Sequence, residues 1–144
     1  MNQHATIINQ LKQQNHRITK VRSALIELFL TVDAPLAVSD ILRFLHAKKS
    51  IQANKTTIYR ELQFLQNQSL VREISLSEDK KRYELSGEHH HHLICVKCQK
   101  IENFSLSEEL SQIESEIKQQ KKFSVQQHSL EFFGICAACQ KTNY

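Results

Sequence analysis

Apolar residues recur at helical spacing in four segments of the first half of the chain. After Asn54, for example, Ile58, Leu62 and Leu65 follow one another at intervals of four and three and form a single stripe. Polar capping residues and breaks bound these segments. The pattern predicts helices over about residues 5–14, from a Thr19 cap to the break at 33–35, from Val38 or Ser39 to about 48–50, and from 55 to about 67.

The next stretch changes to the alternation that is typical of strands. Residues 70–74 and 82–85 alternate apolar and polar positions, and the polar residues 77–80 can form the turn between them. Helices followed by such a hairpin indicate a winged helix-turn-helix, a fold that binds DNA. We therefore expect this domain over residues 1–85.

Residues 86–88 hold one of the two glycines and are predicted to be a hinge. Beyond them, two short strands (93–96 and 101–104), a helix from Ser107 to about residue 120, and a last strand region within 123–133 are expected. Residues 89–144 would then form a small α/β dimerisation domain, so the whole chain is of the α+β class. Because this part has few apolar residues, we expect zinc and a partner subunit to stabilise it.

Composition narrows the class of protein. The 144 residues are 40% hydrophobic, which is adequate for a core. No segment approaches the roughly 20 apolar residues of a membrane span, and the N-terminus has no export signal. We therefore expect a cytoplasmic protein without a membrane partner. The net charge of +4 permits a nucleic-acid partner without establishing one.

The N-terminal end of the predicted fourth helix carries residues suited to DNA. Hydroxyls, a phenol and cations at a helix N-terminus can anchor phosphates and contact base edges in the major groove. These residues are Lys55, Thr56, Thr57, Tyr59 and Arg60. In the hairpin, Lys80 and Lys81 would add contacts to the DNA backbone. The alternative is a solvated surface with one packed tyrosine, but the hairpin that follows favours DNA binding.

The four cysteines occur as two Cys-x-x-Cys pairs, Cys95 with Cys98 and Cys136 with Cys139. Such a pair turns the backbone so that both sulfurs reach one ion, and two pairs complete a tetrahedral zinc site. Redox-active pairs or buried thiols are the alternatives. Redox pairs usually lie at a strand-to-helix junction, which neither pair has. Cysteines kept for metal also fit a reducing cytoplasm.

Four consecutive histidines, His89 to His92, directly precede the first cysteine pair. In a strand, alternate side chains point to opposite faces, so His90 and His92 would share one face and His89 and His91 the other. One run can therefore supply ligands to two metal sites. A solvated polar loop is the alternative, although histidine tracts beside cysteines tend to bind metal.

Several stretches together resemble the ferric uptake regulator (Fur) superfamily over the full length of the chain. They are residues 16–22, 56–62, 83–85, 89–98 and 128–136. The resemblance implies a homodimer that binds double-stranded operator DNA and responds to a metal ion at its hinge, with no small-molecule substrate beyond metal ions.

The resemblance also implies roles for particular residues. Tyr59 and Arg60 correspond to the residues of the recognition helix that touch DNA. Three groups of metal ligands follow: Cys95, Cys98, Cys136 and Cys139 for a structural zinc; Glu84, His90 and His92 for the hinge sensor site; and His89, His91, His128 and Glu109 for a further site.

Two positions depart from the iron and peroxide sensors of this superfamily. Pro35 stands where they often supply a histidine, and Asn103 where they often supply a carboxylate. Glu102 is one step away and so on the opposite strand face. An oxygen-rich shell for iron or manganese is therefore harder to assemble than a four-coordinate zinc shell.

We accordingly expect a zinc-sensing repressor of the zinc uptake regulator type, with Glu73 on the facing strand as the candidate fourth ligand. The alternatives are an iron-sensing or a peroxide-sensing regulator, whose regulatory metal would be iron or manganese. Two other classes of protein also remain open. One is a zinc hydrolase with Glu84 or Glu88 as its general base, although no His-Glu-x-x-His helix is present. The other is a zinc-buffering or protein-interaction module that does not bind DNA.

Overall fold

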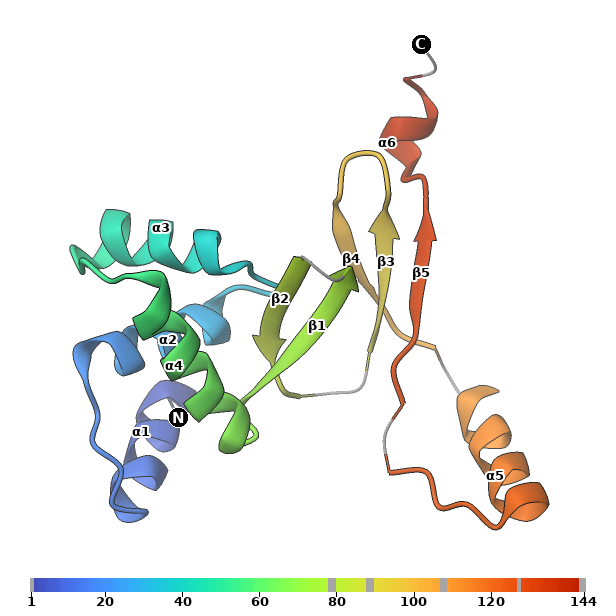
Figure 1. Cartoon of the computed structure of the whole chain (residues 1–144), viewed down its shortest axis with the longest axis horizontal. Helices are drawn as coiled ribbons and strands as arrows, with labels where there is room; N and C mark the ends of the chain where they lie inside the picture. Colours follow the sequence, from blue (N-terminus) through green and yellow to red (C-terminus); the bar gives the residue numbers. More distant parts are fainter. Residues whose placement is uncertain (1, 78–79, 88–89, 107–108, 127, 143–144) are drawn as a thin grey trace. The chain divides into compact units, whose positions relative to one another are not determined.

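The chain divides into two compact units, Met1–Gly87 and Glu88–Tyr144 (Figure 1). The computed structural model describes residues 2–77, 80–87, 90–106, 109–126 and 128–142, without the side chains of residues 76, 77, 80 and 109. Glu88 of the predicted hinge and His89 of the predicted metal site therefore lie outside the described residues. The same holds for the side chains of Lys80 and Glu109.

The first unit begins with four helices whose starts are fixed by local caps. The predicted caps Thr19 and Asn54 are confirmed, since their side-chain oxygens accept hydrogen bonds from the N–H of Arg22 at 3.1 Å and of Thr57 at 2.9 Å. The first helix starts earlier than predicted because Asn2 caps it. The helices are α1 (Gln3–Gln13), α2 (Lys20–Thr31), α3 (Val38–Lys49) and α4 (Lys55–Asn67).

The apolar stripes of these helices form the core of the first unit. The predicted stripe of α4 is confirmed, because Ile58, Leu62 and Leu65 are all buried. They pack with residues from α2 and α3, the most deeply buried of which are Leu25, Ile41 and Leu45. Burial of this stripe fixes which face α4 turns outward.

Strands β1 (Val71–Ser77) and β2 (Lys80–Leu85) form the predicted hairpin. Leu36, in the segment before α3, extends this sheet by exchanging two backbone hydrogen bonds with Tyr83, at 2.7 and 2.8 Å. Cross-strand partners share a face and neighbours along a strand alternate. Val71 and Tyr83 therefore join the core, whereas Arg72 and Glu84, which pair with each other, lie on the opposite face.

The second unit contains a three-stranded sheet in the order β4-β3-β5. The central strand β3 (His91–Cys95) pairs antiparallel with β4 (Ile101–Phe104) and parallel with β5 (Glu131–Gly134). Helix α5 (Glu109–Lys121) was predicted, although its expected cap Ser107 lies outside the described residues, whereas the short α6 (Ala137–Gln140) was not predicted. The expected last strand region forms a strand only in its final residues, because only there does it pair with β3.

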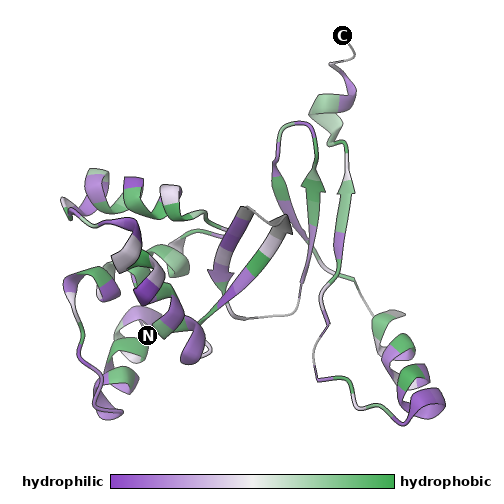
Figure 2. Ribbon diagram, viewed as in Figure 1, coloured by the Kyte–Doolittle hydropathy of each residue, from purple (hydrophilic) through white to green (hydrophobic). Residues whose placement is uncertain are grey.

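Large apolar side chains of the second unit remain exposed. Phe132 is 44% exposed, Phe133 57% and Ile135 43%, and all three line a hollow of about 340 Å³ on the sheet. Hydrophobic residues are also frequent along β3 (Figure 2). As expected from composition, this unit does not bury its apolar surface within one chain. Among the described residues, no helix has the length and apolar character needed to cross a membrane.

Candidate metal centres and nucleic-acid interface

The four cysteine sulfurs lie within 4.8 Å of one another. The Sγ atoms of Cys98 and Cys136 are 3.7 Å apart, which is too long for a disulfide. A tetrahedral zinc ion with Zn–S bonds of about 2.3 Å separates its sulfurs by about 3.8 Å. The donor set and its spacing therefore fit zinc, and the predicted four-cysteine site is confirmed.

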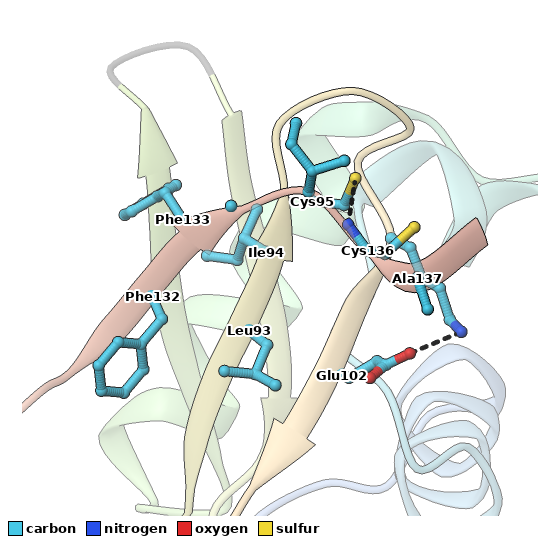
Figure 3. Close-up of a pocket in the computed structure, with 11 residues that line it drawn as sticks. Leu93, Ile94, Cys95, Glu102, Phe132, Phe133, Cys136 and Ala137 are labelled. Atoms are coloured by element: carbon cyan, nitrogen blue, oxygen red, sulfur yellow. Dashed lines mark hydrogen bonds and ion pairs between the residues drawn. The ribbon is translucent and has the colours of Figure 1, made fainter. Parts of the chain in front are cut away.

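Pairing of β3 with β5 brings the two cysteine pairs together. Cys95 ends β3 opposite Gly134 of β5, so Cys136 follows directly beside it. The N–H of Cys136 donates to Cys95 Sγ at 3.3 Å (Figure 3). Beyond the pairs, Lys97 Nζ donates to the carbonyl oxygen of Thr142 at 2.8 Å. The pairing of β3 with β5 and the hydrogen bond from Lys97 to Thr142 thus hold the two cysteine pairs close together.

The sulfurs influence one another's ionisation. The backbone N–H of Cys136 stabilises the neighbouring thiolate and lowers the pKa of Cys95 to about 6. Hydrogen bonds with the sulfurs of Cys136 and Cys98 raise the pKa of Cys139 to about 12. One thiolate therefore forms readily, but a full set of four needs a bound cation to balance its charge.

The histidine run supplies two pairs of imidazoles. The rings of His90 and His92 meet edge to face with centroids 5.0 Å apart. The ring of His91 stacks on that of His128 at 5.4 Å. His91 and His92 are both buried, at 2% and 4% exposed. The alternation of β3 thus separates the described histidines into two groups.

A carboxylate that the sequence did not single out joins the second pair. Glu114 Oε1 of α5 lies 2.5 Å from His128 Nδ1, within hydrogen-bond distance. Glu114 follows Leu110 by four positions and precedes Ile117 by three, so it lies on the apolar stripe of the helix. A carboxylate on an apolar stripe was the signal that could have identified it. The predicted role of Glu109 remains a prediction.

Glu84 and Glu73 lie on opposite faces of the hairpin. Glu84 pairs with Arg72 in the β1–β2 register, and Glu73 pairs with Tyr83. The carboxylate of Glu73 lies 3.5 Å from Lys81 Nζ. The hairpin therefore does not direct both carboxylates towards one ion, which counts against Glu73 as the fourth ligand.

The residue across the sheet from His92 is Asn103. Its amide occupies the position at which the iron and peroxide sensors of this superfamily often have a carboxylate. Glu102 pairs instead with Leu93 and forms an ion pair with Lys100 at 2.7 Å. The register therefore agrees with the expectation that Glu102 lies on the other face from His92.

The N-terminal end of α4 presents its polar residues to solvent. Tyr59 is 49% exposed. Lys55, Thr56 and Arg60 are exposed as well, and Thr57 is half-buried. Lys81 on β2 is exposed, with its ammonium group near Glu73. A cationic helix end with hydroxyl and phenol groups has the chemistry needed to hold DNA phosphates and reach base edges.

A largely buried ion pair holds α4 against α2. Arg22 Nε donates to Glu61 Oε2 at 2.8 Å, and both side chains are less than 15% exposed, at 14% and 12%. The guanidinium carbon also lies 3.5 Å from the centre of the Phe64 ring. Arg22 Nη1 donates to the carbonyl oxygen of Arg17 at 2.7 Å. Sequence reasoning missed this cluster.

Comparison with known proteins decides the family. The sequence model of the ferric uptake regulator family matches residues 13–133 of this chain. This chain belongs to the ferric uptake regulator family. The ferric uptake regulation protein of Synechococcus elongatus is 31% identical over 142 residues, which cover 96% of this chain and 95% of that protein.

Two solved structures share the fold of this chain. The Helicobacter pylori ferric uptake regulator, described as having three functional metal binding sites, matches with a TM-score of 0.81 at 23% identity, covering 97% of this chain and 93% of that one. A zinc uptake regulator in complex with zinc and DNA matches with a TM-score of 0.65 at 25% identity, covering 96% and 93% respectively.

Membership of the ferric uptake regulator family establishes the class of protein. Family members are homodimeric, metal-responsive transcription repressors that bind double-stranded DNA, and this chain is one of them. It is not an enzyme, so the zinc-hydrolase alternative is excluded. A module that does not bind DNA is excluded on the same grounds. The four clustered cysteines fit a structural zinc, and the zinc uptake regulator noted above is a zinc complex.

Proposed function

We propose that this ferric uptake regulator family member is a zinc-sensing repressor that binds the sensed ion with Glu84, His90 and His92. The donor chemistry carries this proposal. Two imidazoles lie side by side, with ring centroids 5.0 Å apart, and Asn103 rather than a carboxylate lies across the sheet from His92. Imidazole suits zinc, whereas iron(II) and manganese(II) favour sites with more oxygen ligands.

Ligands from both units would let one ion control DNA binding. Glu84 belongs to the first unit, and His90 and His92 belong to the second. We assign residues 1–85 to DNA binding, 86–88 to a hinge and 89–144 to dimerisation. When all three ligands hold one ion, the hinge loses freedom. The two α4 helices of a dimer can then enter successive major grooves, about 34–36 Å apart.

The energy that the ion must supply is modest. A 100-fold change in DNA affinity needs a preference of the ion for the DNA-binding state of only about 2.7 kcal/mol. In this proposal Lys55, Tyr59 and Arg60 of α4 bind the operator, aided by Lys80 and Lys81. DNA affinity therefore falls steeply with salt, because phosphate contacts release counterions. The protein acts in the cytoplasm, where its thiols remain reduced.

A further metal position is proposed at His91 and His128. Their stacked rings and the contact between His128 and Glu114 support it. Glu114 supplies the carboxylate in this proposal, and the predicted His89 and Glu109 remain additional candidates. The exposed apolar surface around Phe132 and Phe133 is the proposed contact with the partner subunit.

Iron sensing is the second candidate function. It is favoured by the Synechococcus elongatus relative, which is named a ferric uptake regulation protein. Oxygen ligands from Asn103 or from water would have to complete the coordination shell in that case.

Operator binding under buffered metal separates the two functions. The untagged protein, with its cysteine-bound zinc retained, is titrated with zinc(II), iron(II) or manganese(II), and binding to DNA from its own upstream region is measured by fluorescence anisotropy. Because such sites usually bind zinc more tightly than iron or manganese whichever metal they sense, each metal is buffered at its physiological free concentration. Zinc sensing predicts that only zinc gives operator binding under these conditions. A response to iron at physiological concentrations with none to zinc would contradict zinc sensing.

A further inference from the structure

Arg72 holds the carboxylate that we assign to the sensed ion. It lies directly across the β1–β2 hairpin from Glu84. Its Nε and Nη2 lie 2.6 and 2.5 Å from the same oxygen, Glu84 Oε1. Hydrogen bonds between two charged groups are roughly twice as strong as those between neutral groups. The carboxylate of Glu84 is therefore already paired with the guanidinium of Arg72 in this structure.

The two side chains differ in their access to water. The side chain of Glu84 is 6% exposed, whereas that of Arg72 is 34% exposed. A buried carboxylate without a countercharge is strongly unfavourable, so the guanidinium compensates Glu84. Arginine does not lose its proton in proteins, but its long aliphatic stem allows the charged end to turn into water. If Arg72 leaves Glu84, it therefore remains charged and its guanidinium turns into solvent.

A divalent ion and this guanidinium would share one carboxylate. The lone pairs of Glu84 Oε1 now accept N–H groups from Arg72, so an ion that ligates this oxygen must displace them. Two cations within about 5 Å of each other repel strongly where water is partly excluded. We propose that Arg72 is the internal competitor that the sensed ion displaces from Glu84, and that it thereby sets the metal concentration at which the repressor responds. This inference rests on the proposed sensor role of Glu84.

Arg82 provides a matched control on the same face of the hairpin. It lies two positions before Glu84 on β2, so both side chains share a face. Its guanidinium is directed to another carboxylate, Asp40, at 3.7 Å. Replacing Arg82 removes the same charge from the same face but leaves the hydrogen bonds from Arg72 to Glu84 in place.

The test measures zinc(II) affinity of the full-length dimer against a competing chelator, with the cysteine-bound zinc retained. Arg72→Gln is expected to bind the sensed zinc about tenfold more tightly than the wild type, because the competing charge is gone. Arg82→Gln is expected to stay within about twofold. In a Glu84→Gln background, Arg72→Gln is expected to add nothing.

Two further measurements keep the test decisive. With the sensor zinc removed by chelator, Arg72→Gln is expected to lower Tm, since Glu84 loses its countercharge. Arg72→Lys keeps the charge but not the paired N–H donors of the guanidinium, and its gain in affinity is expected to be smaller. This variant replaces Arg72→Gln if the latter does not fold.

The outcomes separate this inference from the proposed function. If Glu84→Gln weakens zinc binding but Arg72→Gln has the affinity of the wild type, the competition by Arg72 is refuted while the sensor site stands. If Glu84→Gln leaves zinc affinity unchanged, the sensor site itself is wrong, and the role of Arg72 falls with it.

Discussion

At the scale of single residues, function depends on which groups each backbone register brings to the same face. The β1–β2 register pairs Glu84 with Arg72 and turns Glu73 to the other side. At the start of β3, His92 contacts the ring of the preceding His90, and His91 contacts His128. A shift of one residue in either strand would exchange these partners. Register is therefore as important for metal binding as the identity of the ligands.

Arg60 provides a prediction at this scale. In the proposed function it contacts operator DNA from the exposed end of α4. Arg60→Ala is expected to weaken operator binding by about tenfold or more, the cost of one good contact to DNA, with metal content unchanged. Fluorescence anisotropy and metal analysis measure the two effects. Lys118→Ala, which removes the same charge from exposed α5, should bind DNA like the wild type. Equal losses in both variants would contradict the assignment of α4.

Local patterns were sufficient for much of the fold. Thr19 and Asn54 were recognised as caps because a cap acts within three residues of its own position. The cysteine site was recognised because the spacing within each pair almost determines its chemistry. Glu114 was missed because its contact with His128 spans fourteen positions in sequence. The short α6 has too few residues to show helical periodicity.

At the scale of elements, the position of α4 depends on the ion pair between Arg22 and Glu61. The pair joins α2 to α4 directly beside Arg60, in a largely buried setting. The aromatic ring of Phe64 covers the guanidinium, and the ring of His16 meets Phe64 edge to face at 5.0 Å. These contacts tie α4 to the segment between α1 and α2.

Breaking this pair gives a prediction about stability. Arg22→Met leaves the Glu61 carboxylate buried without a partner, which is expected to cost about 3 kcal/mol of unfolding free energy. Denaturant unfolding of the holoprotein measures it. The double variant Arg22→Met, Glu61→Met should recover most of the loss. Arg43→Ala removes a pair 3.7 Å long whose arginine is 74% exposed, so it should be almost neutral. A similarly small effect of Arg22→Met would show that the pair does not hold α4.

At the scale of the whole molecule, the protein combines a self-contained unit with one that depends on additional partners. The first unit buries a continuous core from four helices and the hairpin. The second exposes Phe132, Phe133 and Ile135 and relies on the four-cysteine zinc site. Homodimerisation, which the family establishes, gives such a surface a partner. In the proposed function, one ion held by Glu84, His90 and His92 then joins the DNA-binding unit to the dimerisation unit.

The most direct test compares the zinc dependence of operator affinity in the wild type and in the double variant His90→Ala, His92→Ala. For wild-type protein with its cysteine-bound zinc retained, added zinc is expected to strengthen binding by about 100-fold, near the upper range of allosteric coupling. The double variant is expected to stay dimeric, keep the cysteine-bound zinc and respond by less than about twofold. A double variant with the full response of the wild type would contradict the account.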